Sequence, residues 1–166
     1  MSVQLLIDKL ELLPHPEGGY FKETYRSQGE IPEASLSSDF EGNRNYATGI
    51  YYLLESGDYS ALHKIKQDEM WHFYQGDAIE LVTITEEGEL NVVLIGSDIA
   101  NNEQPQYVVP KNVWFAASVS KPNSYALAGC TVSPGFDFRD FELGSYEQLV
   151  DLFPQHEAYI KKFTRV

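Results

Sequence analysis

The chain has 166 residues with a single cysteine, and its formal net charge at pH 7 is -13. This length allows one sizeable hydrophobic core, so a single domain spanning residues 1–166 is predicted. The acidic excess repels phosphate backbones and anionic lipid surfaces, so neither nucleic acid nor membrane partners are expected. The lone Cys130, the lack of a basic-flanked apolar leader and the absence of an apolar run near ~20 residues predict a cytoplasmic location.

The two ends of the chain carry helical patterns. Apolar residues recur at helical spacing over residues 3–12, with Ser2 placed to cap the start and Pro14 to stop the helix. Near the other end, Ser145 precedes a second short helix, and Pro154 separates it from a last helix over residues 158–163.

The middle of the chain is rich in short strand patterns. Residues 28–43 are predicted to be a loop, because they are rich in Gly, Ser, Pro and acidic residues. Strands are predicted at residues 20–27, 46–54, 61–65, 69–75, 78–85, 90–95, 106–109, 113–119 and 124–132, and residues 137–142 fit one more. Many short strands at this spacing predict a mainly β, antiparallel barrel or sandwich.

Polar and turn chemistry coincide in residues 57–76, GDYSALHKIKQDEMWHFYQG. The spacing of Gly57, His63, Glu69 and Gly76 resembles the first motif of the cupin superfamily, in which a glycine, a His-x-His pair, a Glu and a closing glycine place metal ligands on two neighbouring strands. The second histidine of the pair is replaced by Ile65.

Several other stretches narrow the resemblance. They are HPEGGYF at 15–21, TYRS at 24–27, DEMWHFY at 68–74 followed by Gly76 and Asp77, VWFA at 113–116, GCTV at 129–132 and PGFDF at 134–138. Together they resemble cupin family five, a domain of unknown function, over nearly the whole chain. The resemblance implies an RmlC-like jelly roll that forms a homodimer and is related in shape to seed-storage globulins, germins and dTDP-sugar 3,5-epimerases.

The ligand set of a metal-binding cupin is incomplete in this sequence. In the second cupin motif, Phe115 stands where the family pattern has a histidine. His63 and Glu69 are then two donors, whereas a stable first-row metal site takes three or four. His72 would be a third donor only across a bulge, because strand alternation places it on the face opposite Glu69. We therefore expect no cofactor, and keep a divalent metal on His63 and Glu69 as the alternative.

His63 is the predicted general base, because an imidazole exchanges protons near neutrality. This interpretation resembles the sugar 3,5-epimerases, in which a histidine abstracts a proton beside a keto group, an Asp orients the histidine and a tyrosine is the acid. Asp137 or Asp140 is the candidate for the orienting carboxylate, and sequence does not choose between them.

The sequence also leaves the identity of the general acid undecided, with Tyr20, Tyr52 and Tyr125 as candidates. The catalytic set expected from the sequence is His63, Glu69 and Tyr125. The expected ligand-binding residues are Glu17, Tyr20, Tyr52, Trp71, His72 and Phe136.

Three arginines, Arg26, Arg44 and Arg139, are candidates for holding an anionic ligand, since a guanidinium binds phosphate bidentately. The alternative is that they pair with the many acidic residues. Of the aromatic side chains Trp71, Phe73, Trp114, Phe115 and Phe136, most are expected to fill a barrel interior. Cys130 is expected to be a buried core thiol.

The sequence as a whole predicts a barrel that binds a small polar, sugar-like ligand and transfers a proton without a metal, as an epimerase or isomerase does. Two alternatives stay open. One is a metal-dependent oxygenase or isomerase, and the other is a ligand-binding or storage-type protein that does not turn its ligand over.

Overall fold

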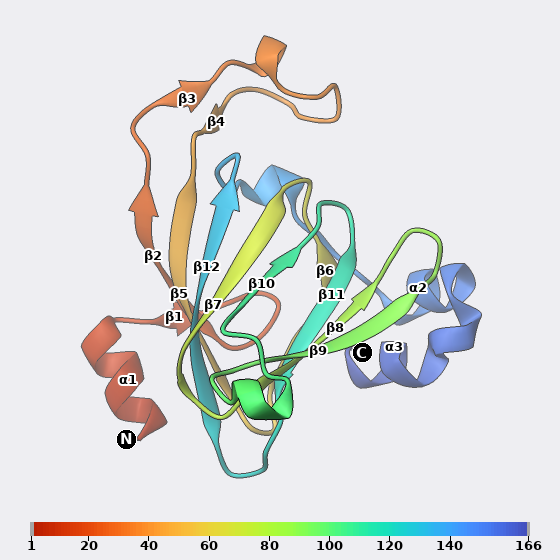
Figure 1. The fold of residues 1–166 in the computed structure, drawn as a ribbon. Coiled ribbons are helices and arrows are strands. Elements are labelled where there is room, and N and C mark those ends of the chain that lie inside the picture. The colour runs from red at the N-terminus through yellow and green to blue at the C-terminus, as the bar shows by residue number, and fades with distance from the viewer. Residues whose placement is uncertain (1, 166) are drawn as a thin grey trace.

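Two antiparallel sheets face each other in the computed structural model, which describes residues 2–165 (Figure 1). The larger sheet has six strands in the order β1-β2-β5-β12-β7-β10, and the other has five in the order β13-β6-β11-β8-β9. A separate pair, β3-β4, forms an arm that extends beyond the two sheets (Figure 1). All pairings between these strands are antiparallel, which confirms the predicted mainly β architecture.

Most of the predicted strands are present, with boundaries shifted by a residue or two. The strands are β1 Leu13–Pro14, β2 Tyr20–Arg26, β3 Glu30–Ile31, β4 Arg44–Asn45, β5 Thr48–Glu55, β6 Tyr59–Lys64, β7 Asp68–Gly76, β8 Ile79–Ile84, β9 Leu90–Ile95, β10 Gln106–Val109, β11 Trp114–Val119, β12 Tyr125–Ser133 and β13 Glu142–Leu143. The helices are α1 Val3–Leu10, α2 Tyr146–Leu152 and α3 Glu157–Lys162, with short 3-10 turns η1 Glu33–Ser35, η2 Ile99–Asn101, η3 Phe138–Asp140 and η4 Pro154–His156.

Two predicted elements differ from the structure for local reasons. The first helix ends at Leu10, because Glu11 adopts a left-handed conformation with φ 56° that a helix cannot continue. The segment predicted as a strand over residues 137–142 begins instead with η3, because the Asp137 side chain accepts a hydrogen bond from the Arg139 backbone N–H and caps the turn. Only β13 of that segment pairs with a sheet.

The space between the two sheets holds the main core. Side chains from both sheets meet there, including Tyr52 and Trp71 from the six-stranded sheet and Leu81 and Phe115 from the five-stranded sheet. Burying this apolar area supplies most of the driving force for closing the barrel. The interior is filled toward one end and hollow toward the other, where the candidate site lies.

The helices cover outer faces of the sheets. The C-terminal helices pack Leu149 and Ile160 against the outward side chains of the five-stranded sheet, and α1 packs Leu6 against Leu53 and Leu127 of the other. The predicted N-caps are confirmed, because Ser2 and Ser145 each accept a hydrogen bond from a backbone N–H of their helix. Among residues 2–165, no helix is both long enough and apolar enough to cross a bilayer.

Candidate functional site

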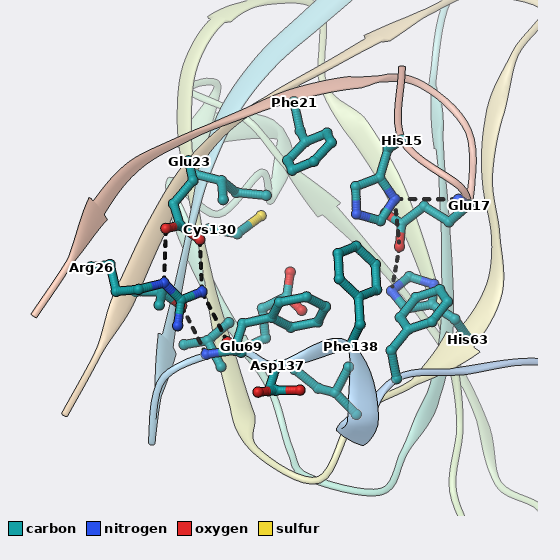
Figure 2. A pocket seen from close by; sticks show the side chains of 16 residues that line it. His15, Glu17, Phe21, Glu23, Arg26, His63, Glu69, Cys130, Asp137 and Phe138 are labelled. Carbon is teal, nitrogen blue, oxygen red and sulfur yellow. Dashed lines mark hydrogen bonds and ion pairs between the residues drawn. The ribbon is translucent and has the colours of Figure 1, made fainter. Parts of the chain in front are cut away.

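A cavity of about 310 Å3 opens between the two sheets, next to the segment that precedes β2 (Figure 2). Its walls combine ionisable side chains with phenyl rings and aliphatic groups. The lining residues are His15, Glu17, Phe21, Glu23, Arg26, Thr48, Ile50, His63, Ile65, Glu69, Cys130, Val132, Phe136, Asp137, Phe138 and Phe141. This size suits a small molecule, and the few polar groups among apolar walls are typical of ligand sites.

The segment at residues 15–19 is held against the barrel by backbone contacts that require glycine. Gly18 and Gly19 have φ of +115° and +69°, and a Cβ on Gly18 would lie 2.1 Å from the Tyr59 carbonyl oxygen. The Ala61 backbone N–H donates to the Glu17 carbonyl at 2.8 Å, which fixes the segment beside β6. The glycines are therefore structural, and their effect is to hold the Glu17 side chain inside the cavity.

Glu17 and His63 form a buried pair. The Nε2 of His63 lies 3.0 Å from Oε2 of Glu17, and the Ser60 hydroxyl donates to the other carboxylate oxygen at 2.9 Å. Burial by itself raises the pKa of Glu17, but the charge and hydrogen bond of His63 outweigh it and lower that pKa to about 2.

Both nitrogens of the His63 imidazole are occupied. Nδ1 donates to the Ala61 carbonyl oxygen at 2.7 Å, and Nε2 faces Glu17. Burial lowers the pKa of His63, but the Glu17 carboxylate has the larger combined effect and raises it above its ordinary value. The pair is therefore an imidazolium and a carboxylate, and neither nitrogen is free to take a proton from a ligand.

His15 contacts the same carboxylate from another side but is neutral. Its Nδ1 accepts a hydrogen bond from the Glu17 backbone N–H at 3.2 Å, so this nitrogen carries no proton and the 3.5 Å to Glu17 Oε2 is no hydrogen bond. Burial is the main cause that lowers the pKa of His15. The neutral ring then carries its proton on Nε2, which faces the cavity in Figure 2.

Glu69, on β7, is buried but lacks a strong hydrogen-bond donor. Its exposed fraction is 8%, and the only donor beside it among the described residues is the Cys130 thiol, a weak one. Burial raises the pKa of Glu69 to about 7; the charge of His63 opposes the shift and that of Glu17 adds to it. A carboxyl with this pKa exchanges protons readily near neutral pH.

Phenyl rings form the wall facing these polar groups. Phe138 lies 5.0 Å from Phe136 and 6.0 Å from Phe141 between ring centroids, in edge-to-face arrangements. The His15 ring continues this wall, with its centroid 4.6 Å from that of Phe21. At the rim, the Arg26 guanidinium donates to both Glu23 carboxylate oxygens at 2.8 and 2.9 Å.

The three candidate tyrosines do not line the cavity. Tyr20 and Tyr125 pack on the outer side of the six-stranded sheet, in the cluster covered by α1. Tyr52 points inward but is fully covered, and its hydroxyl donates to the Gly18 carbonyl oxygen at 2.7 Å. Burial raises the pKa of Tyr52 well above its ordinary value. Strand phase and depth therefore place Tyr125, the expected acid, and Tyr20 and Tyr52, the expected ligand contacts, away from the cavity wall.

Two other expected ligand-binding residues, both on β7, also lie away from the cavity wall. Trp71 is inside the barrel, but it belongs to the packed core against Tyr52, with ring centroids 5.5 Å apart. His72 faces outward, as its alternation with Glu69 predicted, and hydrogen bonds with Thr131 and Gln106 on the neighbouring strands. Neither lines the cavity, whereas the predicted residues His63, Glu69, Glu17 and Phe136 do.

The other charged candidates are paired with each other. Arg44 is buried and binds Asp140 bidentately at 2.7 Å, a structural ion pair that anchors the β3-β4 arm. Asp137 lines the rim, where its ion pair with Arg139 holds its pKa well below the usual range. The carboxylate that orients His63 is therefore Glu17 rather than either predicted aspartate.

The donor set does not fit a metal ion. Ile65 lines the cavity where the family pattern has a second histidine, and the Phe115 ring lies 4.0 Å from that of His63. Both His63 nitrogens are already hydrogen bonded, which leaves Glu69 as a single accessible ligand of the expected pair. Within residues 2–165, no group of three or more His, Cys, Asp or Glu side chains is arranged to hold a metal.

Sequence reasoning missed part of the site. His15, Phe21, Glu23, Phe138 and Phe141 all line the cavity. The available signal was the spacing of His15 and Glu17 beside the two glycines, and the Phe-x-x-Phe pair that follows Gly135. Cys130 is buried as predicted, and it also forms part of the cavity wall next to Glu69.

Comparison with known proteins supports the fold and family. A family model described as Cupin superfamily (DUF985) matches residues 4–144. The chain is 36% identical over 149 residues to the uncharacterised protein YML079W of Saccharomyces cerevisiae, covering 84% of this chain and 73% of that protein. A hypothetical protein from Leishmania major has 35% identity and a TM-score of 0.91 over 100% of both chains. Protein SO0799 from Shewanella oneidensis has 38% identity and a TM-score of 0.90, with 99% of this chain and 98% of that one covered. The chain belongs to the cupin superfamily, in the family of unknown function that the sequence motifs indicated.

Proposed function

We propose that this protein binds a small polar, sugar-like molecule in the cavity and moves a proton on it without a metal, in a reaction of the isomerase or epimerase kind. The observation that supports this most is Glu69, a buried carboxyl in a ligand-sized cavity with its pKa raised to about 7. Perturbed acids of this kind concentrate at catalytic sites, because a base with a pKa near the working pH transfers protons most efficiently.

The roles differ from those expected from the sequence. Glu69 takes the place of His63 as the base, because the His63 nitrogens are hydrogen bonded to Glu17 and Ala61. His15 takes the place of a tyrosine, because its neutral ring presents Nε2 to the cavity. A carboxylate base working with a neutral imidazole that donates to a carbonyl oxygen is an established arrangement for this chemistry.

The reaction would proceed in two proton transfers at carbon. The Glu69 carboxylate takes a proton from the carbon beside the ligand carbonyl, and the C–H electrons form a C=C bond as the carbonyl electrons move onto oxygen. The His15 N–H stabilises the charge that develops on that oxygen. Return of the proton from Glu69 to the neighbouring carbon gives the isomer, while the hydroxyl proton of the enediolate passes through the His15 imidazole to the former carbonyl oxygen. Return of the proton to the same carbon gives the epimer when the planar intermediate first turns its other face to Glu69.

Hydrogen exchange tests this without knowledge of the natural substrate. The protein is incubated in D2O with a panel of keto- and aldo-sugars that includes amino sugars, and deuterium at carbon is followed by NMR. We expect exchange in the wild type and a loss on the order of 100-fold or more in Glu69→Gln. Glu87→Gln, the same change at an exposed turn, is the control and should exchange normally. Full exchange in Glu69→Gln together with loss in His63→Asn would return the role of base to His63.

A non-catalytic binding function is the second candidate. It is favoured by the lack of any tyrosine among the cavity-lining residues, which removes the acid expected by analogy with epimerases. In that case a ligand would raise the thermal unfolding midpoint without any exchange of its carbon-bound protons. A homodimer, expected from the family resemblance, stays a prediction.

A further inference from the structure

The positive charges that residues 2–165 place around the cavity are all paired within the protein itself. Arg26 donates to Glu23 through two nitrogens, to Asn45 at 2.7 Å and to the Phe136 carbonyl oxygen at 3.1 Å. His63 is paired with Glu17, as described above. Arg139, just outside, donates to Asp137 at 2.8 and 3.0 Å. An anionic ligand would therefore have to break one of these pairs to obtain a counter-charge.

The acidic side chain of Glu69, in contrast, is not paired in this way. Glu69 is 8% exposed, faces the cavity and has no cationic partner in direct contact among residues 2–165. An unpaired buried carboxylate is costly, so a bound group that supplied a positive charge would remove that cost. An anion placed beside Glu69 would instead add repulsion in a poorly hydrated space.

The phenyl rings of the cavity wall also favour a positively charged ligand. The phenyl rings of Phe136, Phe138 and Phe141 lie close together at one side of the cavity, and Phe138 keeps 54% of its surface exposed. The faces of such rings carry partial negative charge and attract cations, and the attraction grows when the cation is desolvated. The rim adds Glu23 and Asp137, each already neutralised by its arginine.

We infer that the ligand of this cavity carries a positive charge, in the form of a protonated amino group that lies between Glu69 and the phenyl rings. The inference rests on the proposed function for the location of the ligand and specifies the ligand's charge. A cation at this place has a chemical consequence for the proposed reaction. It favours the ionised form of Glu69, so that binding of the ligand would keep the base in the form that accepts a proton.

A matched set of three probes tests the sign of the charge. Benzylamine, benzyl alcohol and benzoate have similar size and differ in carrying a positive charge, none and a negative charge. Affinities are measured by ligand-observed NMR at pH 7.5. We expect benzylamine to bind at least tenfold more tightly than benzyl alcohol, and benzoate to bind most weakly. Equal or tighter binding of benzyl alcohol or benzoate, or no binding of benzylamine, overturns the inference.

Two variants test whether Glu69 and Phe138 cause the preference for benzylamine. Glu69→Gln should remove most of the preference for benzylamine over benzyl alcohol, whereas Glu87→Gln should keep it. Phe138→Leu keeps an apolar side chain and removes the ring, and it should weaken benzylamine several-fold more than benzyl alcohol. Retention of the full preference in Glu69→Gln would show that the charge is bound elsewhere. Failure of the proposed proton transfer is seen separately, in the deuterium exchange experiment, because the binding series does not depend on turnover.

Discussion

Glu17 and Glu69 line the same cavity and are almost equally buried, with exposed fractions of 6% and 8%, yet their pKa values are shifted in opposite directions. Glu17 accepts hydrogen bonds from His63 and Ser60, and its pKa falls to about 2. Glu69 has a thiol as its nearest donor, and burial raises its pKa to about 7. The donors around a buried carboxyl therefore decide its charge, and burial alone does not.

The two carboxyls also make opposite contributions to stability as pH changes. The pKa of Glu17 is lowered on folding, so its contribution is present above its ordinary pKa of 4.5 and is lost as pH falls toward 2. The pKa of Glu69 is raised on folding, so Glu69 costs no stability below pH 4.5. The free energy of unfolding then falls as pH rises from 4.5 through about 7. At neutral pH, Glu17 on one side of the cavity therefore stabilises the fold, whereas the reactive Glu69 on the other side destabilises it.

The largest expected change in stability comes from removing the negative charge of Glu17. Glu17→Gln leaves the buried His63 imidazolium without its carboxylate, so we expect a loss of roughly 3–5 kcal/mol in the free energy of unfolding at pH 7. Urea denaturation measures it, and the loss should shrink as pH falls from 4.5 toward 2. Glu87→Gln should stay within about 0.5 kcal/mol of wild type. A Glu17→Gln protein as stable as wild type at pH 7 would contradict the assignment of an ion pair.

For Glu69, the corresponding substitution is expected to increase the free energy of unfolding. Glu69→Gln removes a carboxyl whose ionisation is unfavourable in the folded state, so the variant should be more stable than wild type at pH 8 by roughly 2–3 kcal/mol. The gain should disappear at pH 4.5, where Glu69 is protonated in the wild-type fold. Denaturation at the two pH values checks this, and a destabilised variant at pH 8 would mean that Glu69 has a partner that stabilises its charge.

The smallest effect concerns the Cys130 thiol. Cys130→Ser replaces a weak donor beside Glu69 by a hydroxyl, so the pKa of Glu69 should fall, by less than about one unit. Cys130→Ala removes the donor and should move that pKa upward. The carboxyl 13C shift of Glu69, followed against pH, reports both. An unchanged midpoint in both variants would show that the thiol has no part in setting the pKa.

Local patterns in the amino-acid sequence were enough to predict the strands, the inward face of β7 and the family. Alternation with a period of two is a property of any extended chain, so the order of residues alone places Glu69 and Trp71 inside and His72 outside. The same rule applied to β12 places Tyr125 outside, because the small residues Ala126 and Ala128 fill the inward positions. The helix caps at Ser2 and Ser145 are likewise local, and they were predicted correctly.

Which groups meet in the cavity depends on the folding together of distant segments. His63 is paired with Glu17 because the glycine turn brings the segment before β2 against β6, and the predicted partners Asp137 and Asp140 bind arginines instead. Depth within the barrel separates Trp71 from Glu69 although both side chains point inward. The physical reason is that strand phase is set by neighbours in the chain, whereas the partner and pKa of a buried group are set by tertiary contacts.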